Sequence, residues 1–553
     1  RIMIIVGVLF VLVLIQWGCN YYISNYGHVM GAKIEYDMRA EIFNHYQKLS
    51  YSFYDDQKVG QLLSRITSDL FDITELLHHG PENITISLIK IVGALVILST
   101  IDVRLTLTAF VLVPVMLVFA YFLNKKMKRA FKRNRIRIGE INAQIEDNLS
   151  GIRVVKSFAN EDIECGKFKK GNDLFLESKK DSYHYMGMYN AGLTAFTTMI
   201  NVIVIAVGGI GITRGWVNIT DFVTFLLYIN IFTEPVKVLI DFTEQFQNGY
   251  SGFERFMEMI SVIPDIKDAP DAQPMQEVKG NISFENVSFH YADSDQMVLN
   301  HVNLDVPAGE YVALVGSSGA GKTTLCSLIP RFYDPQEGTV KVNGINAKDY
   351  PQGELCSEIG VVQQRSILFK GSIRDNLKWG NDQASDEDLW KAITIAQAKD
   401  VVEAKPGKLD FEVEQNGRNL SGGQKQRLTI ARALVSKPEI LILDDSLSAL
   451  DFATDAALRK AIGELEGNVT TFLVSQRISG IRQADKILVM EDGELAGQGT
   501  HEELMETCET YQEIYYSQFP EERPDAVKSS KETGKDLDKA DKMTEKAEKG
   551  AAE

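Results

Sequence analysis

The sequence predicts two fold classes in one chain: an all-α domain of membrane-spanning helices, followed by an α/β domain. Five apolar blocks in the first half each span about 20 residues, the length that a helix needs to cross a bilayer. From residue 281 onwards, strand-like and helix-like patterns alternate, which is typical of a largely parallel sheet with helices on both faces. A glycine-rich loop there separates a strand pattern from a helix pattern. The apolar blocks are residues 2–22, 84–101, 105–123, 191–212 and 222–240.

Basic residues predict how these spans are oriented. Eight lysines and arginines between residues 125 and 137 directly follow the third block, and such an excess marks a cytoplasmic segment. The segment between the first two blocks is then cytoplasmic as well, and the short connections at 102–104 and 213–221 lie outside. Five spans place residue 1 outside, and the first block lacks the basic leader and cleavage site of a signal peptide. We therefore expect a further span before residue 1.

Shifts in composition predict the domain boundaries. We expect a transmembrane domain at residues 1–258, whose two cytoplasmic segments (31–77 and 130–185) are amphipathic and helical. A linker rich in proline and aspartate follows at 259–280. The α/β domain then covers 281–519. Residues 520–553 are highly charged with almost no large apolar side chain, so they are expected to form a disordered tail.

Charge and cysteine usage restrict the possible partners and the compartment. The net charge is -17 and the pI is near 5.1, whereas a nucleic-acid-binding domain carries a strongly basic face. We therefore expect no nucleic-acid partner. The five cysteines show neither paired nor metal-binding spacing, which favours free thiols that mostly face a reducing cytosol.

The glycine-rich loop matches the phosphate-binding pattern G-x-x-x-x-G-K-[ST]. An apolar strand pattern at 311–315 precedes it and a helix pattern follows, which is the context that the motif requires. Backbone N–H groups of such a loop surround phosphate oxygens, Lys322 reaches the terminal phosphates, and the Thr323 hydroxyl binds Mg²⁺. The sequence therefore predicts a site for a nucleotide and Mg²⁺. The loop consists of Gly316, Ser317, Ser318, Gly319, Ala320, Gly321, Lys322, Thr323 and Thr324.

Two further stretches identify the family that the chain resembles. Residues 420–424 read Leu-Ser-Gly-Gly-Gln before a helix pattern, and residues 440–445 form an apolar strand that ends in two aspartates. With the phosphate loop, in this order and spacing, they resemble the ATP-binding cassette (ABC) exporters, and the resemblance covers the chain except its tail. It implies a half-transporter with ATP and Mg²⁺ as cofactors. Exporters of this kind have six spans in each half, which agrees with the further span expected above.

The resemblance assigns roles to individual residues. It implies that Tyr291 stacks on adenine, although an aromatic there could equally be a packing residue. Gln364 matches the glutamine that senses Mg²⁺ and contacts the membrane helices, and Asp444 matches the carboxylate linked to Mg²⁺. Asp451 belongs to the loop that crosses between paired ATPase domains. The signature residues, which contact the γ-phosphate of the ATP held by the partner subunit, are Ser421, Gly422, Gly423 and Gln424.

Two residues depart from the pattern of hydrolytic family members. Asp445 stands where those members have the glutamate that orients the attacking water, and Gln476 stands where they have the switch histidine. An amide cannot exchange a proton near neutral pH as imidazole does. Gln363 also replaces the usual proline before Gln364. The site is therefore predicted to be degenerate, and the intact signature predicts a heterodimer with a second half-transporter that supplies the catalytic glutamate and switch histidine.

The membrane half contains further candidates. Short coupling helices that touch the ATPase domain are expected at 54–61 and 160–168, by the same resemblance. Two ionisable residues lie within the apolar blocks, where such residues are functional candidates. Lys90 could extend its side chain to the interface. Glu234 stands beside Pro235 in the last block, and a substrate contact, a structural salt bridge or a water-exposed helix end all remain open for it.

The function implied is ATP-driven export of drugs or other amphipathic small molecules across a plasma membrane, most readily a bacterial inner membrane. The ATPase domain would lie in the cytoplasm and the spans would contact membrane lipid. A lipid flippase and a peptide exporter are alternatives on the same fold. A channel or regulatory subunit that binds ATP as a signal is the alternative of another class.

Overall fold

A computed structural model describes residues 1–275, 279–465 and 468–523. It contains two compact units. The helical unit comprises residues 1–47 and 59–262, and the second unit comprises residues 48–58 together with the chain from residue 263 onwards. The charged tail that the sequence predicts falls almost entirely on residues 524–553, which lie outside the described residues.

The helical unit consists of long helices that contain all five predicted spans. Five of its helical stretches are long and apolar enough to cross a membrane. Two π-helical turns, η1 (Ile23–Gly27) and η2 (Arg65–Asp69), interrupt the first and second of these stretches. The α-helices are α1 (Ile2–Tyr22), α2 (His28–Tyr46), α4 (Val59–Ser64), α5 (Leu70–Ile101), α6 (Val103–Ser150), α7 (Ile152–Ser157), α8 (Glu161–Thr213) and α9 (Ile219–Ile260).

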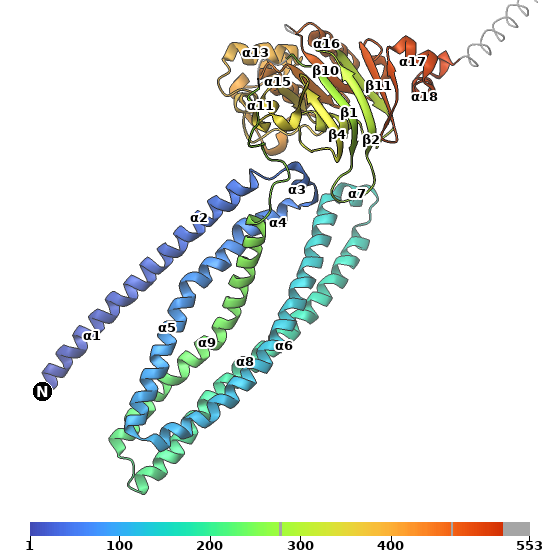
Figure 1. The fold of residues 1–553 in the computed structure, drawn as a ribbon. Helices are drawn as coiled ribbons and strands as arrows, with labels where there is room; N and C mark the ends of the chain where they lie inside the picture. The colour runs from blue at the N-terminus through green and yellow to red at the C-terminus, as the bar shows by residue number, and fades with distance from the viewer. Residues whose placement is uncertain (276–278, 466–467, 524–553) are drawn as a thin grey trace, which may run out of the picture. The chain divides into compact units, whose positions relative to one another are not determined.

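The helices of this unit pack mainly in two pairs. Helix α5 lies along α9, and α6 lies along α8 (Figure 1). Apolar side chains fill the space between them, among them Leu105 and Phe225, both fully buried. Arg255 of α9 donates two hydrogen bonds to the Asp69 carboxylate of η2, at 2.7 and 2.6 Å, and so fixes that end of the α5–α9 pair.

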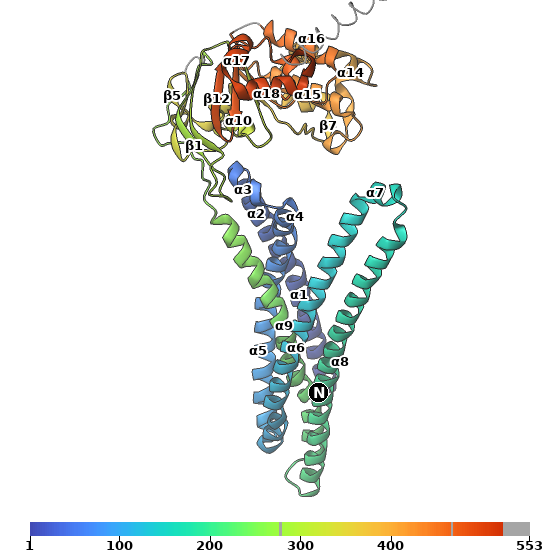
Figure 2. The ribbon, with the colours of Figure 1, turned by 90° about the vertical axis from the view of Figure 1, so that its right-hand side faces the viewer.

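The structure corrects both predicted coupling helices. The first short helix is α3 (Tyr51–Asp56), which overlaps the predicted 54–61 only at residues 54–56. The second is α7, in the turn between α6 and α8 (Figure 2), whereas the predicted 160–168 forms the start of α8. Three acidic residues in the first turn of α8 favour a helix start there, because carboxylates stabilise helix N-termini. They are Glu161, Asp162 and Glu164.

The second unit contains two main sheets. A four-stranded antiparallel sheet has the order β2-β1-β4-β5, and a six-stranded, mainly parallel sheet has the order β12-β11-β3-β10-β9-β6. A small pair, β7 (Gly371–Ser372) and β8 (Glu412–Val413), stands apart. The main strands are β1 (Ile282–Phe289), β2 (Leu299–Val306), β3 (Tyr311–Gly316), β4 (Glu337–Val342), β5 (Ile345–Asn346), β6 (Ile359–Val362), β9 (Ile440–Asp444), β10 (Thr470–Val474), β11 (Lys486–Glu491) and β12 (Glu494–Gly499).

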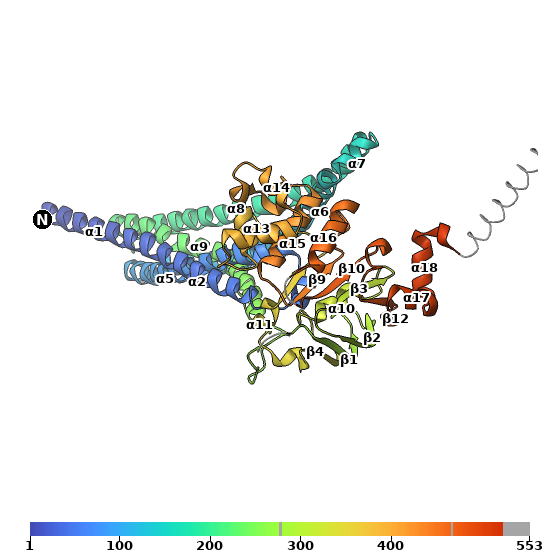
Figure 3. The same ribbon diagram turned by 90° about the horizontal axis from the view of Figure 1, so that it is seen from above.

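Helices and the four-stranded sheet cover opposite faces of the six-stranded sheet. In β3, Val312 and Leu314 face the core shared with the four-stranded sheet, and Ala313 and Val315 face the helical core. Burial on both faces explains why these strands read as continuous apolar runs. Figure 3 shows α13, α14 and α15 grouped away from β1, β2 and β4. Besides α3, the α-helices described in the second unit are α10 (Lys322–Leu328), α11 (Gln352–Ser357), α12 (Ile373–Lys378), α13 (Asp386–Ile395), α14 (Lys399–Glu403), α15 (Gly422–Val435), α16 (Phe452–Gly463), α17 (His501–Thr507) and α18 (Glu509–Gln518).

Candidate functional site

One edge of the six-stranded sheet gathers most of the predicted site residues. Strands β3, β10, β9 and β6 are parallel neighbours, and Val474 of β10 pairs with both Leu314 of β3 and Asp444 of β9. The residues that directly follow these strands therefore emerge together, at the carboxyl edge where open α/β sheets bind ligands. They are the phosphate loop after β3, Asp445 after β9, Ser475 and Gln476 after β10, and Gln363 and Gln364 after β6.

The phosphate loop requires glycine at its first and last glycine positions. Gly316 has φ 149°, and a Cβ there would lie 2.2 Å from the Met490 carbonyl oxygen. Gly321 has φ 96°, and a Cβ there would lie 2.8 Å from the Val298 carbonyl oxygen. No larger side chain fits in either place, because such contacts are far below van der Waals distance. The loop thus keeps its backbone close to the sheet.

Lys322 begins α10 and points back over this loop. Its ammonium donates hydrogen bonds to the carbonyl oxygens of Gly316 and Ser317, at 3.0 and 2.6 Å. Burial lowers the pKa of Lys322, and the nearby carboxylates of Asp444 and Asp445 partly oppose that shift. Lys322 is therefore a buried cation held by backbone oxygens, next to the positions where phosphate oxygens bind in loops of this type.

Thr323 and Asp444 form a pair of oxygen groups suited to Mg²⁺. The Thr323 hydroxyl donates a 2.9 Å hydrogen bond to the Asp444 carboxylate. Asp444 is only 7% exposed, and burial raises its pKa. A hydroxyl and a carboxylate are hard oxygen ligands, and Mg²⁺ is typically held by one or two carboxylates with phosphates and water. The donor set therefore fits the predicted metal.

Gln364 and Asp445 meet at the same edge. The Gln364 amide lies 3.4 Å from the Asp445 carboxylate, a long hydrogen bond. The Asp445 N–H donates to the Val474 carbonyl at 3.1 Å, and its φ of 44° lies in the left-handed region that aspartate tolerates. Gln476 is exposed, and its carbonyl accepts a hydrogen bond from Gln518 of α18 at 2.6 Å. The two positions that depart from the family pattern, Asp445 and Gln476, are thus both held at the carboxyl edge by hydrogen bonds of their backbone atoms.

Tyr291 lies just beyond β1, where its hydroxyl and the Thr324 hydroxyl form a 2.9 Å hydrogen bond. Its ring makes edge contacts with Phe289 and Tyr333. Burial raises the pKa of Tyr291. The side chain also lines a cavity of about 310 Å³. Tyr291 therefore combines the packing role that the sequence left open with a direct link to the phosphate loop.

The signature residues form a separate group in this chain. Ser421 caps α15 in a reciprocal capping box with Gln424. The buried Gln426 accepts a 3.2 Å hydrogen bond from the Ala449 N–H, which joins α15 to the loop that ends at Asp451. Asp451 in turn caps α16 through Thr454. Within the described residues, no hydrogen bond or ion pair joins Ser421, Gly422, Gly423 or Gln424 to the phosphate loop.

Sequence reasoning expected a short helix here to touch the ATPase domain, but it did not identify the residues through which α3 makes its contact. It belongs to the second unit, where the Tyr51 ring stacks on Phe332 with centroids 4.3 Å apart. The Gln363 amide donates to the Tyr51 hydroxyl at 3.4 Å, and the Tyr333 hydroxyl donates to Asp55 at 2.8 Å. Gln363, the residue in place of the usual proline, therefore touches α3 directly beside Gln364. The one sequence feature that could have indicated this contact is the aromatic pair Phe332 and Tyr333, which follows α10.

The helical unit contains an apolar cavity that does not include Glu234. The cavity measures about 440 Å³ and lies between α5, α6 and α9. Glu234 is exposed on α9, while its neighbours Phe232 and Val236 line the cavity from the opposite side of that helix. Lys90 is exposed on α5. The role of Glu234 stays a prediction. Other lining residues are Ile91, Phe110, Leu117, Asn124 and Ile240.

Comparisons with known proteins agree with this two-part organisation. Residues 1–236 match the family model of the ABC transporter transmembrane region, and residues 299–448 match that of the ABC transporter. The chain is 40% identical over 511 residues to an uncharacterized ABC transporter ATP-binding protein of Bacillus subtilis, YwjA, covering 92% of this chain and 89% of that protein. It is 35% identical over 483 residues to a putative multidrug export ATP-binding/permease protein of Staphylococcus aureus, covering 87% and 84%.

A solved structure shows the same fold. The chain superposes on a bacterial Atm1-family ABC exporter with ATP bound at a TM-score of 0.80 and 27% sequence identity. The match covers 93% of this chain and 92% of that one.

Proposed function

Because the chain belongs to the ABC transporter family as an exporter half-transporter, we propose that it exports amphipathic small molecules across a bacterial plasma membrane as one subunit of a heterodimer. Its own ATP site would mainly retain ATP. Hydrolysis would occur at the other site, which the Ser421–Gln424 signature of this chain completes. The observation that carries the proposal is that Asp445 and Gln476 lie at the carboxyl edge beside a complete phosphate loop.

The residues at that edge support ATP binding. Lys322 would exchange its two carbonyl hydrogen bonds for phosphate oxygens, which offer a formal negative charge and so a stronger, charge-assisted bond. Thr323 and Asp444 would hold Mg²⁺, which neutralises phosphate charge when bound. Tyr291, whose hydroxyl already reaches Thr324, would contact the base end of the nucleotide. All of these residues match the family pattern for binding ATP and Mg²⁺.

The same edge is poorly equipped for hydrolysis. Orienting a water for attack needs a carboxylate placed to within a fraction of an ångström. Asp445 is one methylene shorter than glutamate, and the Gln364 amide approaches its carboxylate. Gln476 offers an amide in place of an imidazole, so it can bond to a phosphate oxygen but cannot carry a proton. A site that binds tightly and turns over slowly follows from this combination.

The separation of the signature from the phosphate loop within one chain favours a dimer, and the departures at Asp445 and Gln476 favour a heterodimer. Two identical copies would form two sites without a catalytic glutamate. A partner half-transporter with glutamate and histidine at these positions would give one competent site, completed by the signature of this chain. The apolar lining of the cavity between α5, α6 and α9 favours an amphipathic cargo, whether a drug, a lipid or an apolar peptide.

The test is the ATPase activity of the chain purified alone in lipid nanodiscs. It should bind ATP yet hydrolyse it at a background rate, and addition of the partner should restore turnover. Lys322→Ala should abolish ATP binding at this site and serves as the control. Robust hydrolysis by the lone chain that Lys322→Ala removes would overturn the heterodimer proposal.

A second measurement separates export from the channel alternative. In sealed inside-out vesicles that contain both subunits, ATP should drive a fluorescent amphipathic cation against its gradient. An ATP-gated channel would instead produce a conductance that dissipates a gradient. Uptake that stops when the partner's catalytic glutamate is changed to glutamine would support the exporter.

A further inference from the structure

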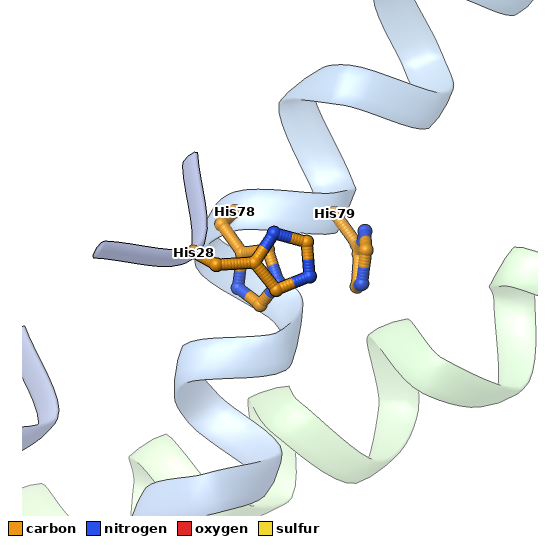
Figure 4. Close-up of side chains that lie close together, drawn as sticks. All are labelled: His28, His78 and His79. Carbon is orange, nitrogen blue, oxygen red and sulfur yellow. The ribbon is translucent and has the colours of Figure 1, made fainter. Parts of the chain in front are cut away.

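Three histidines from two helices meet in the helical unit (Figure 4). His28 is the first residue of α2, directly after the π-helical turn η1, and His78 and His79 are adjacent in α5. One potential ligand nitrogen from each ring lies within 4.8 Å of the other two. Because the chain has only eight histidines, their meeting across 50 residues of sequence points to a ligand that imidazoles bind.

The hydrogen bonds of His78 determine which nitrogen is free. Its Nδ1 lies 2.6 Å from the Thr74 carbonyl oxygen, and only an N–H can bond to a carbonyl, so Nδ1 carries the proton. The lone pair is therefore on Nε2. His78 is 9% exposed, and its Nε2 is buried without a hydrogen-bond partner among the residues that the structure describes. A buried, unpaired nitrogen of this kind needs a partner.

The Nδ1 atom of His79 is also bonded to an oxygen acceptor, in this case a carboxylate. Its Nδ1 lies 3.2 Å from a Glu82 oxygen, which assigns the proton to Nδ1 and the lone pair to Nε2. An outer carboxylate or carbonyl on Nδ1 is how proteins orient imidazoles that bind a metal through the other nitrogen. Both α5 histidines therefore have an oriented ring and an available Nε2.

Glu75, one turn earlier in α5, faces both free nitrogens. Its two carboxylate oxygens lie 3.8 Å from His78 Nε2 and 3.7 Å from His79 Nε2. These separations are too long for hydrogen bonds. They are slightly wider than the roughly 3.3–3.5 Å expected between two ligands that each lie about 2.0–2.2 Å from one tetrahedral ion. Glu75 thus lies beside the two α5 histidines, although it is not one of the three residues whose ligand atoms all lie within 4.8 Å of one another.

We propose that His28, His78, His79 and Glu75 bind one divalent transition-metal cation. Three neutral imidazoles and one carboxylate suit Zn²⁺, Co²⁺, Ni²⁺ or Cu²⁺, whereas Mg²⁺ and Ca²⁺ prefer sites made of oxygen alone. Glu75 and the outer Glu82 together balance the charge of the ion. The ion joins the start of α2 to α5 and so fixes the π-helical turn between α1 and α2. This site is independent of the ATP site and of the proposed export function.

The surroundings permit access and close approach. His78 and His79 precede the apolar residues 84–101 by five or more positions, so the cluster lies outside the apolar segment of that helix. Gly31, one turn after His28, lies against the His78 ring, and a Cβ there would be 3.0 Å from His78 Nδ1. Glycine at this position lets α2 come close enough to α5 for His28 to reach the cluster.

The test is a Co²⁺ titration of the full chain in lipid nanodiscs, without nucleotide and with excess Mg²⁺ to fill oxygen sites. The purification tag must contain no histidine. Tetrahedral Co²⁺ with nitrogen ligands gives intense visible absorption, which should saturate at one ion per chain and be displaced by Zn²⁺. His78→Ala should weaken binding by more than the roughly 10–100-fold that loss of an outer partner costs, and Glu82→Gln should fall within that range.

Two variants keep the result interpretable. His184→Ala is the matched control, because His184 is exposed on α8 and lies outside the cluster, and it should leave binding unchanged. His28→Ala removes a ligand from the other helix at an exposed position, so it tests the site even where His78→Ala lowers the yield of folded protein. Thermal stabilisation by ATP verifies folding of each variant. Absence of saturable absorption in the unmodified chain, or binding that both His→Ala variants retain, would overturn the proposal.

Discussion

At the scale of single residues, the carboxyl edge of the six-stranded sheet combines the expected phosphate- and Mg²⁺-binding residues with an aspartate in place of glutamate. Lys322 and Asp444 are buried, and the exposed Thr323 donates a hydrogen bond to Asp444, which is the arrangement that binding requires. Asp445 places its carboxylate about 1 Å short of where a glutamate would reach, and an error of that size can cost about 100-fold in rate. Binding and hydrolysis thus depend on different residues, so substitutions can separate them.

Asp445→Asn should therefore change the steady-state ATPase of the heterodimer by no more than a few-fold. Under the retention proposal the Asp445 carboxylate does not orient the attacking water, so its charge would contribute little to the rate. The matching glutamate-to-glutamine change in the partner should reduce turnover by roughly 10²–10⁴-fold, the usual contribution of general acid–base catalysis. If Asp445→Asn is as damaging as the change in the partner, this site turns over and the retention proposal fails.

Asp444 should make the stability of the nucleotide-free protein depend on pH. Burial raises its pKa in the folded state above the unfolded value, so the folded state binds the proton more tightly. By linkage, stability is then highest below the unfolded pKa and falls as the pH rises through the folded pKa. Asp444→Asn removes the ionisable group, and with it this fall in stability at higher pH.

Thermal unfolding of both proteins at pH 4 and pH 7 measures the effect. The melting temperature of Asp444→Asn should exceed that of the unmodified chain by more at pH 7 than at pH 4. The stabilisation that Mg²⁺ adds to ATP should be lost in the variant. An equal difference at both pH values would show that burial of the charge is not the cause.

At the scale of elements, α3 is the part of the second unit that comes from the membrane half of the sequence. It docks through the Tyr51–Phe332 stack and through the bond from Tyr333 to Asp55. Gln363 connects it to the segment that continues into Gln364 and, through Gln364, to Asp445. A displacement of α3 could therefore be transmitted to the carboxyl edge through only a few contacts.

Tyr51→Ala should weaken this docking. Loss of the aromatic pair costs about 0.5–1.5 kcal/mol beyond buried area, or roughly 2–10-fold in the docking equilibrium. Cargo stimulation of the ATPase should fall by a similar factor, while ATP binding by the nucleotide site remains. Tyr51→Phe keeps the ring and loses only the long bond to Gln363, so it should stay close to the unmodified chain. Equal damage by both variants would assign the coupling to the hydroxyl rather than to the stack.

At the scale of the whole molecule, the proposed function assigns parts of this chain to two different ATP sites. The phosphate loop and Asp444 serve its own site, while the signature at Ser421 is held on α15 and linked to the loop before Asp451. Under the proposed function, neither part makes a complete site within one chain, so assembly with a partner would be a requirement of the chemistry.

Ser421→Ala tests this division. The change removes the hydroxyl that would reach the partner's nucleotide, so ATPase activity of the heterodimer should fall at least tenfold, as expected for loss of a hydrogen bond to a charged group worth about 1.5–3 kcal/mol. ATP binding by the lone chain, measured with a fluorescent analogue, should be unchanged. Loss of ATP binding in the lone chain would instead indicate that the substitution disturbs α15, since Ser421 also caps that helix.

Local patterns were sufficient for much of the protein. The five spans, the phosphate loop between β3 and α10, and the strand that ends at Asp444 could be predicted because each depends on residues close together in the chain. The short helices were misplaced by several residues. Helix α3 is too short to have a clear apolar period, and its position depends on Phe332 and Tyr333, far away in the sequence.

The sequence by itself determined the family and the five apolar spans, and it predicted the phosphate loop, since steric and hydrogen-bonding demands on a loop or a span act over a few neighbouring residues. Only the tertiary structure decided which distant residues meet. The parallel register of β3, β10, β9 and β6 brings Gln364 to Asp445, and the packing of α2 on α5 brings His28 to His78 and His79. Such contacts arise from the burial of whole apolar faces, which many side chains share, so no short stretch of sequence specifies them.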